Sequence, residues 1–280
     1  MNKKFITFGG GGQKYIDASN RLINQINNTK LFDDTKFYND NYLKNDKQFW
    51  NKHGTFILNN KRGYGYWLWK PYIIKKTMEE MKNDDILLYL DCGCEMEYKK
   101  KDTLKKYFDY VKNDKIIGCK TQIEKNWNKM DLVLHLDCNK KDIMDSPQHE
   151  AGAILFLVCN ETRELVNKWY KTVCNYHYID DSPSISKNIN EFKEHRHDQS
   201  IFSLLTKKYK LFSDKSLHNC INYSRNKSGI SQIKEHFTSN INNYNTNNYQ
   251  YYNLKNKLVL LIILFLILIL ILILKKLYTI

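Results

Sequence analysis

Several features that would assign a protein class at once are missing from this sequence of 280 residues. Its 7 cysteines are odd in number and have neither the spacing of a disulfide framework nor that of a zinc ribbon. Cys92 and Cys94 are close together but have no second pair, so we interpret them as small residues beside a strand end. No internal repeat is visible. These absences argue against a disulfide-stapled secreted domain, a zinc ribbon or a repeat protein, and the cysteines fit a reducing compartment.

The sequence also lacks a signal peptide and a clustered basic segment. Residues 1–12 begin with a basic stretch, but only four apolar residues precede the glycines, which is too short for the apolar part of a signal peptide. The net charge of +14 would suit nucleic acid, an anionic membrane surface or a phosphorylated substrate. However, the lysines are spread along the whole chain, and Lys99–Lys101 forms the main run. We therefore expect no nucleic-acid partner.

One long apolar run is present, Leu258–Leu274. Its 17 residues would span about 26 Å as a helix, which is at the short end of what a bilayer core requires. Lysines flank both ends, where their amines can reach the headgroups. A buried core helix or strand is the alternative, but an apolar run at a chain terminus has nothing to pack on. We predict a single membrane anchor over residues 257–276, preceded by an Asn- and Tyr-rich polar linker over residues 222–256.

The orientation of this anchor is not settled by its flanking lysines, because two lie close to each end. Without a predicted signal peptide, the anchor would insert after synthesis. The simplest topology then leaves the large domain on the cytosolic face of the membrane.

Residues 1–221 alternate between the patterns of strands and helices, as a single α/β domain does. Short apolar runs predict strands at residues 5–8, 86–90, 116–119 and 154–158. Helices are predicted after the first strand, from Pro71 to about Met81, after a cap at Asn160, and over residues 199–207. The run at residues 86–90 lies between charged residues and is typical of a strand buried on both faces. We therefore predict a mostly parallel sheet covered by helices.

Ligands of open α/β sheets bind beyond the carboxyl ends of the strands, and two candidate segments lie there. The first strand runs into four glycines, where a ligand could approach the backbone at Gly9 and Gly10; a flexible turn is the alternative. The buried strand ends at Asp91, with Glu95 close behind. Two carboxylates there could hold Mg²⁺ or Mn²⁺, which prefer oxygen ligands and bridge to phosphates. An ordinary solvated loop is the alternative for this segment.

Two further segments carry side chains typical of ligand sites. EHRHDQ precedes a predicted helix, so its Arg196 could clamp a phosphate and its His197 could complete a metal site. A charged capping segment on the surface is the alternative. RGYGYWLWKP is rich in aromatic residues that could stack on a base or sugar, while Arg62 or Lys70 meets phosphate. The same aromatic residues could anchor the core, and we expect both roles.

These segments, in this order, resemble nucleotide-sugar glycosyltransferases of the GT-A fold. The signature RGYGYWLWKP…DDILLYLDCGCE…HRHDQSIFSLL is similar to that of a poorly characterised branch, distantly similar to glycogenin-like transferases, and the resemblance covers about residues 3–213. It implies that the first strand and its loop cradle the nucleotide, and that a D-x-D motif holds Mn²⁺ or Mg²⁺ with the donor diphosphate. Asp91 matches the first acid, Gly93 occupies the place of the second, and Glu95 is the expected substitute.

Two other elements add to the resemblance. The segment EAGAIL looks like the N-A-G-x-x-L motif near the donor sugar, which implies donor contacts at Ala151 and Gly152. HDQ is similar to the D-Q element beside the reacting sugar. It implies catalytic roles for Asp198 and Gln199, and it places His197 near the metal.

The implied function is transfer of a sugar from a UDP- or GDP-sugar to a hydroxyl of an unknown glycan, lipid or protein at the membrane. In such a reaction, neutralisation of the charge on the leaving diphosphate contributes the largest share of transition-state stabilisation. Asp198 would be the base in an inverting enzyme, whereas the leaving phosphate takes the proton in a retaining one. Two alternatives stay open: a catalytically degenerate binding or scaffold protein, which Gly93 favours, and a basic nucleic-acid-binding protein.

Overall fold

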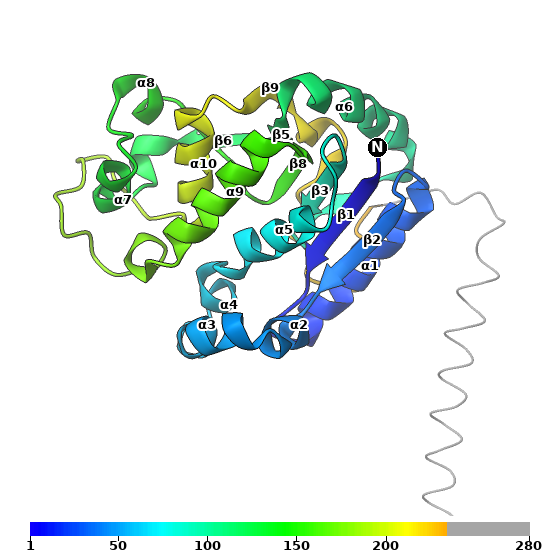
Figure 1. Cartoon of the computed structure of the whole chain (residues 1–280), viewed down its shortest axis with the longest axis horizontal. Coiled ribbons are helices and arrows are strands. Elements are labelled where there is room, and N and C mark those ends of the chain that lie inside the picture. The colour runs from blue at the N-terminus through cyan, green and yellow to red at the C-terminus, as the bar shows by residue number, and fades with distance from the viewer. Residues whose placement is uncertain (234–280) are drawn as a thin grey trace, which may run out of the picture. The chain divides into compact units, whose positions relative to one another are not determined.

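A six-stranded sheet lies at the centre of residues 1–233, the part of the chain that the computed structural model describes (Figure 1). The strands follow the order β2-β1-β3-β8-β5-β9. Their bounds are β1 Lys3–Phe8, β2 Asp34–Tyr38, β3 Ile86–Leu90, β5 Ile116–Gly118, β8 Ala153–Leu157 and β9 Phe212–Ser216. Two small pairs complete the strands: β4 Glu95–Met96 with β10 Ile221–Asn222, and β6 Lys120–Ile123 with β7 Pro147–His149.

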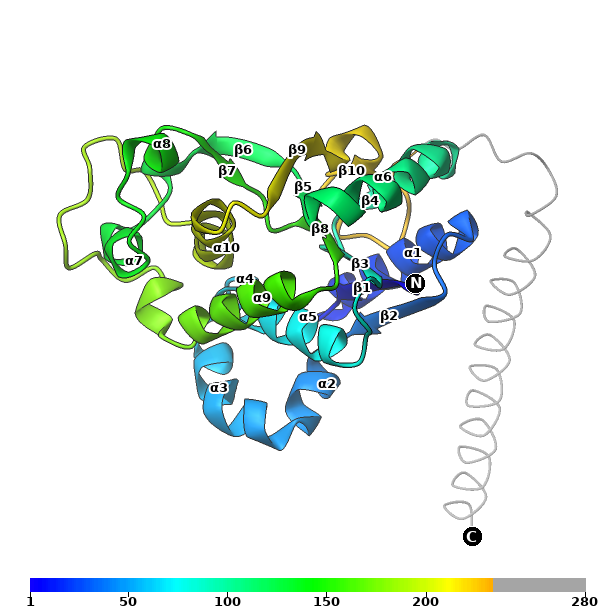
Figure 2. The same cartoon turned by 45° about the horizontal axis from the view of Figure 1, so that its top comes forward.

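Helices cover both faces of this sheet. The longer ones are α1 Gln13–Thr29, α3 Lys47–Asn59, α5 Trp69–Glu79, α6 Lys101–Asp114, α9 Asn160–Val173 and α10 His197–Lys208. The shorter ones are α2 Asp40–Asn45, α4 Gly63–Tyr66, α7 Met130–His135 and α8 Lys141–Met144, with 3-10 turns η1 Tyr98–Lys100, η2 Glu124–Asn126, η3 Tyr176–Tyr178 and η4 Leu217–Asn219. Figure 2 shows α1 and α6 on one side of the sheet and α5 and α9 on the other.

The core lies in two layers because side chains of each strand alternate between the faces. Phe5 and Leu88 pack with α1 and α6, whereas Ile6 and Tyr89 pack with α5 and α9. Every side chain of β3 is buried, as the apolar run at residues 86–90 predicts. This strand therefore sits in the middle of the sheet.

The predicted α/β class and the four predicted strands are confirmed, and the sheet is mixed but mostly parallel. The pairs β1–β2, β1–β3 and β5–β9 are parallel, whereas β8 is antiparallel to both of its neighbours. The reversal of β8 places its beginning beside the end of β3, where Leu90 pairs with Ala153. Residues that precede β8 in sequence thus lie at the same sheet edge as residues that follow β3.

The predicted helices are present at the predicted positions, but their observed ends differ from the predicted ones by one or two residues. Pro71 lies in the first turn of α5, which ends at Glu79, two residues before the predicted end. Asn160 is the first residue of α9, and Cys159 rather than Asn160 occupies the cap position. Asp198 lies inside the first turn of α10, which begins at His197.

The compact unit extends to Ile233, beyond the predicted domain end at residue 221. The reason is that residues after β10 pack on the domain: Asn226 is buried, its carbonyl accepts a hydrogen bond from Arg21, and its amide reaches Glu95 at 2.8 Å. Residues 222–233 are therefore not a free linker. The rest of the predicted linker and the predicted anchor at residues 257–276 lie outside the described residues. Within residues 1–233, no helix is both long and apolar enough to cross a membrane.

A histidine between α3 and α9 gives the fold a measurable dependence on pH. His53 is fully buried, and its ring nitrogens lie 2.9 Å from the Tyr176 hydroxyl and 3.2 Å from the Tyr170 hydroxyl. Burial, with a smaller contribution from Lys52, lowers the pKa of His53 to about 4. The unfolded chain, with an ordinary histidine pKa of about 6.5, binds more protons between these two pH values, so stability falls as the pH falls through that window.

We expect His53→Gln to flatten this dependence. From pH 7 to pH 4, the free energy of unfolding of the wild type should fall by roughly 2–3 kcal/mol more than that of the variant. Urea unfolding at several pH values measures it, and the wild-type-minus-variant difference cancels the other titrating groups. A difference that stays constant across the window would contradict the buried, neutral state of His53.

Candidate functional site

A cleft of about 890 Å³ opens at the sheet edge where β1 and β3 end and β8 begins. All four segments that the sequence singles out contribute to its wall, together with residues before β8 and a stretch after β10. The residues that matter most for the argument are Lys70, Asp91, Gly152, Asp198, Gln199 and Arg225. Since β1 and β3 are parallel and β8 is reversed, this edge gathers segments that are far apart in sequence.

A lysine joined to two carboxylates lies at the cleft. Lys70 of α5 is 3% exposed, and its Nζ lies 2.9 Å from Asp198 Oδ2 and 3.2 Å from Asp91 Oδ1. It also donates to the carbonyl of Ala151 at 3.1 Å. Burial alone would lower the pKa of Lys70, but Asp198 and Asp91 together raise it. The lysine is therefore a charged residue that holds both acids in place.

The two acids have different surroundings. Asp91 is 39% exposed and accepts a hydrogen bond from the buried hydroxyl of Tyr89 at 2.6 Å. Asp198 is 5% exposed, and burial raises its pKa to about 6 although Lys70 opposes the shift. Carboxyl groups with pKa values near the working pH suit proton transfer, whereas an accessible carboxylate suits ligand contact.

The residues before β8 form the side of the cleft next to these acids. The backbone N–H of Asp91 donates to the carbonyl of Gly152 at 2.7 Å, and a side chain at position 152 would press on the Asp91 carboxylate. Ala151 does not line the cleft; its N–H donates to Gln199 Oε1 at 3.4 Å. Gln199 in turn donates to Gln148 at 2.7 Å. Gly152 and Gln199 thus line the cleft, whereas Ala151 lies outside its lining and contacts Gln199 through its backbone.

The segment RGYGYWLWKP adopts a conformation that sequence patterns do not reveal. Residues 63–67 all have positive φ angles, so α4 is a left-handed turn, a conformation that costs non-glycine residues about 1–2 kcal/mol each. The turn directs Tyr64 and Trp67 to the cleft and leaves Tyr66 in the core, while the buried Trp69 also lines the cleft. The aromatic residues of this one segment thus lie both in the core and at the cleft. Strained backbone of this kind persists where the surroundings fix it, often at functional sites.

The two predicted phosphate-binding arginines lie at the cleft and already have protein partners. Arg62 pairs with Asp181 at 3.2 Å and with Glu194. The Arg196 guanidinium stacks on Trp127 at 3.9 Å. Both side chains are therefore fixed in position rather than free on the surface.

Of the two glycines predicted to contact the donor directly after the first strand, only Gly10 lines the cleft. Gly9 is instead pressed against α1, where an added Cβ would lie 2.6 Å from the carbonyl oxygen of Tyr15. The correction has a simple reason. Gly9 permits the close packing of strand and helix, and the open backbone of the cleft starts one residue later.

The prediction that Glu95 replaces the second acid of the D-x-D motif is not supported. Its carboxylate is fully buried away from the cleft, 2.9 Å from Arg21. Burial would raise the pKa of Glu95, but hydrogen bonds from Ser231, Asn226 and Gln25 lower it to about 2. Both carboxylate oxygens are thus occupied by residues of the stretch that follows β10 and by other side chains of the domain, which leaves none for a ligand.

The surroundings of Gly93 explain why this position of the motif holds a glycine rather than an acid. A Cβ at Gly93 would lie 3.1 Å from Arg225 Cα, and the Gly93 carbonyl accepts a hydrogen bond from the N–H of Asn226 at 2.9 Å. The stretch after β10 therefore covers the position of the second acid and brings Arg225 and Lys227 into the cleft wall. The sequence gives no periodic signal for these two basic residues.

The predicted metal ligands do not form a metal site. Asp91, Glu95 and His197 do not come together, and of the three only Asp91 has a partly exposed carboxylate in the cleft. The Nδ1 of His197 lies 2.7 Å from the carbonyl of Ile179, and its Nε2 lies 3.7 Å from Asp181. Burial lowers the pKa of His197, which favours the neutral ring. Among the described residues that line the cleft, basic side chains outnumber acidic ones.

Comparison with known proteins concerns the fold alone. Neither a protein-family model nor a curated protein sequence matches the chain. The arrangement of elements is similar to that of GT-A glycosyltransferases. Mouse xyloside xylosyltransferase 1 is 10% identical over 78% of this chain and 86% of its own, with a TM-score of 0.42. The galactosyltransferase LgtC is 14% identical over 72% of this chain and 70% of its own, with a TM-score of 0.41. The bifunctional glycosyltransferase WbbM is 14% identical over 77% of this chain and 39% of its own, with a TM-score of 0.43.

Proposed function

We propose that this chain transfers a sugar from a nucleoside-diphosphate sugar, a UDP- or GDP-sugar, to a hydroxyl of a glycan, lipid or protein. The observation that carries the proposal is the cluster of Lys70, Asp91 and Asp198 in the cleft where β1 and β3 end. The same three residues belong to the motifs that resemble nucleotide-sugar transferases. A buried lysine between two acids holds one carboxylate for ligand contact and the other for proton transfer.

The cleft wall suits a nucleotide diphosphate. Aromatic side chains of Tyr64 and Trp67 offer faces for a base or sugar ring, and Phe8 stacks on Trp69 at 3.8 Å behind them. Basic side chains also line the cleft: Lys14, Lys61, Arg62, Arg196, Arg225 and Lys227. Charge that develops on a departing diphosphate is stabilised best by cations already in position, which is the chemistry these residues supply.

In the proposed reaction, Asp198 is the base that accepts the proton of the acceptor hydroxyl. Its buried carboxylate is oriented by Lys70 at 2.9 Å, and Gln199 follows it at the cleft. The acceptor would approach from the side of Asp198 while the diphosphate lies toward Arg196 and Arg225. The alternative function is that of a binding protein at a membrane, which has the same fold but no turnover. Gly93 in place of the second acid is the observation that favours this alternative.

We further propose that the chain acts at a membrane surface, held by residues 257–276, with its catalytic domain on the cytosolic side. The support for the anchor is the apolar run Leu258–Leu274 with lysines at both of its ends. Protease accessibility of residues 1–233 in sealed vesicles tests the orientation. Full protection of the domain inside the vesicle would contradict it.

The test of the enzymatic proposal is a panel of UDP- and GDP-sugars presented to the full-length chain in mild detergent. Binding is followed by thermal shift, and turnover by release of the free nucleoside diphosphate. We expect at least one donor to raise the melting temperature and to be hydrolysed slowly without acceptor. Binding without any turnover would favour the non-enzymatic alternative, and no binding of any donor would contradict both.

Arg225 and Lys227 give the sharpest test of how the diphosphate is held. Because charge-assisted hydrogen bonds contribute about 1.5–3 kcal/mol each, Arg225→Ala with Lys227→Ala should weaken UDP binding by at least roughly tenfold. Lys105→Ala with Lys106→Ala is the matched control, since it removes the same charge from the exposed face of α6. Calorimetric titrations are run with and without Mn²⁺. Equal losses in both double variants would mean that net charge, rather than these two residues, determines the affinity.

A further inference from the structure

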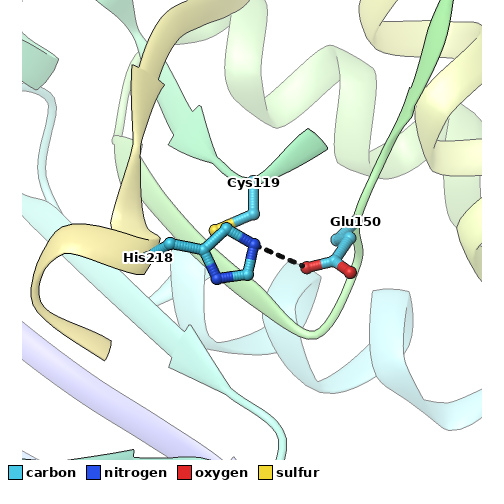
Figure 3. A group of neighbouring side chains, drawn as sticks. All are labelled: Cys119, Glu150 and His218. Atoms are coloured by element: carbon cyan, nitrogen blue, oxygen red, sulfur yellow. Dashed lines mark ion pairs between the residues drawn. The ribbon is translucent and has the colours of Figure 1, made fainter. Parts of the chain in front are cut away.

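Three side chains with metal-ligating atoms meet beside the cleft, and the proposed reaction uses none of them (Figure 3). Cys119 follows β5, Glu150 lies between β7 and β8, and His218 lies in η4. One ligand atom from each lies within 4.8 Å of the others. His218 Nε2 is 3.8 Å from Glu150 Oε2. Three separate elements of the fold thus converge on one point.

The carboxylate of Glu150 lacks the partner that a buried oxygen needs. Its Oε2 is buried and has no hydrogen-bond donor among the described residues. The backbone of Glu150 is fixed, because its N–H donates to the carbonyl of Cys119 at 2.8 Å. An unpaired buried carboxylate oxygen is costly, and a bound cation would satisfy it directly.

The sulfur of Cys119 is buried and surrounded by hydroxyl donors. The hydroxyl of Tyr223 donates to Sγ at 3.1 Å, and that of Ser216 does so at 3.7 Å. Donors of this kind stabilise a thiolate and orient it, which is the role of outer partners at metal sites. Tyr223 also packs its ring against that of His218, with 4.6 Å between the centroids. One tyrosine therefore positions two of the three candidate ligands.

The third ligand keeps a path to solvent. The His218 side chain is 48% exposed, so its imidazole can turn toward an incoming ion while it stays beside Glu150. Neutral imidazole, thiolate and carboxylate together are ligands of zinc rather than of magnesium or manganese. Tetrahedral zinc bonds of about 2.0–2.3 Å require ligand atoms roughly 3.3–3.8 Å apart, which the His218–Glu150 distance already meets.

We propose that Cys119, Glu150 and His218 bind a zinc ion, with the fourth position open to water. The ion would join β5, the start of β8 and η4. Because Tyr223 and Arg225 follow η4 closely in sequence, the ion would also hold the stretch that covers Gly93. Glu150 lines the cleft, so the site stabilises one wall of it. The proposal does not depend on the transferase reaction.

The experiment uses the full-length chain, stripped of metal and then titrated with Co²⁺ and Zn²⁺. We expect one ion per chain, a thiolate-to-cobalt charge-transfer band that zinc abolishes, and a higher melting temperature with zinc. Cys119→Ser should remove the band. His218→Gln and Glu150→Gln should weaken binding by more than the roughly 10- to 100-fold that loss of an outer partner costs.

Cys174→Ser is the matched control, because Cys174 also lies beside a histidine, with 3.8 Å between its Sγ and His53 Nε2, and is half-buried. It should leave the cobalt spectrum unchanged. His218→Gln keeps the test valid if Cys119→Ser does not fold, since His218 is half-exposed. No bound metal, a cobalt complex without a thiolate band, or a band lost in Cys174→Ser would each overturn the proposal.

Discussion

Replacement of Asp198 by asparagine is expected to lower kcat of the proposed transfer by about 10²–10⁴-fold, the usual contribution of a general base. Donor affinity should change by no more than a few-fold, because Asp91 is the exposed acid of the pair whereas the Asp198 side chain is only 5% exposed. Asparagine keeps the size of the side chain and removes its capacity to accept the proton. The two carboxylates thus have separable roles.

The measurement is the steady-state turnover of the donor and acceptor found in the nucleotide-sugar screen, together with calorimetric binding of UDP. Asp109→Asn, on the exposed face of α6, serves as a control that should change neither quantity. A loss of kcat below tenfold in Asp198→Asn would contradict its role as base and would favour proton transfer to the leaving phosphate. A loss of UDP binding would instead make Asp198 a positioning residue.

Much of the sheet is predictable from local sequence, because its central strands are short apolar runs between polar residues. β3 is the clearest case: residues 86–90 are buried on both faces, and a run without alternation is what such a strand requires. Asp91 is predictable for the same reason, since it is the first polar residue after that strand. The edge strands β2 and β9 lack this signal, as their burial is partial, and sequence patterns do not reveal them.

The rest of the site depends on contacts between residues far apart in sequence. The reversal of β8 brings Gly152 beside Asp91, although strand patterns carry no information on direction. Glu95 looks like a ligand because it follows Asp91 closely, yet Arg21 and a stretch some 130 residues later occupy its carboxylate. The polar composition of that stretch predicts a linker, and nothing local shows that Arg225 reaches the cleft.

Lys70→Met should be the most destabilising single change in the cleft. The substitution leaves Asp198 buried without its cation, and removal of one partner of a buried ion pair costs about 3–5 kcal/mol. Methionine preserves most of the volume of the side chain, so the loss reflects charge rather than a cavity. Urea unfolding of the full-length chain, followed by tryptophan fluorescence, measures the effect. Lys75→Met, in the half-exposed pair with Glu79 on the same helix, is the control and should cost less than about 1 kcal/mol.

A second substitution separates the ion pair from the packing around it. Asp198→Asn in the Lys70→Met background removes the buried charge, so the double variant should be more stable than Lys70→Met alone. The double variant should nevertheless lack turnover, since both the oriented base and its cation are gone. Stability that returns without activity would show that Lys70 and Asp198 are retained for chemistry at the cleft. If the double variant is as unstable as the sum of the single changes, the two side chains act independently and the cluster is not the unit that the proposed function requires.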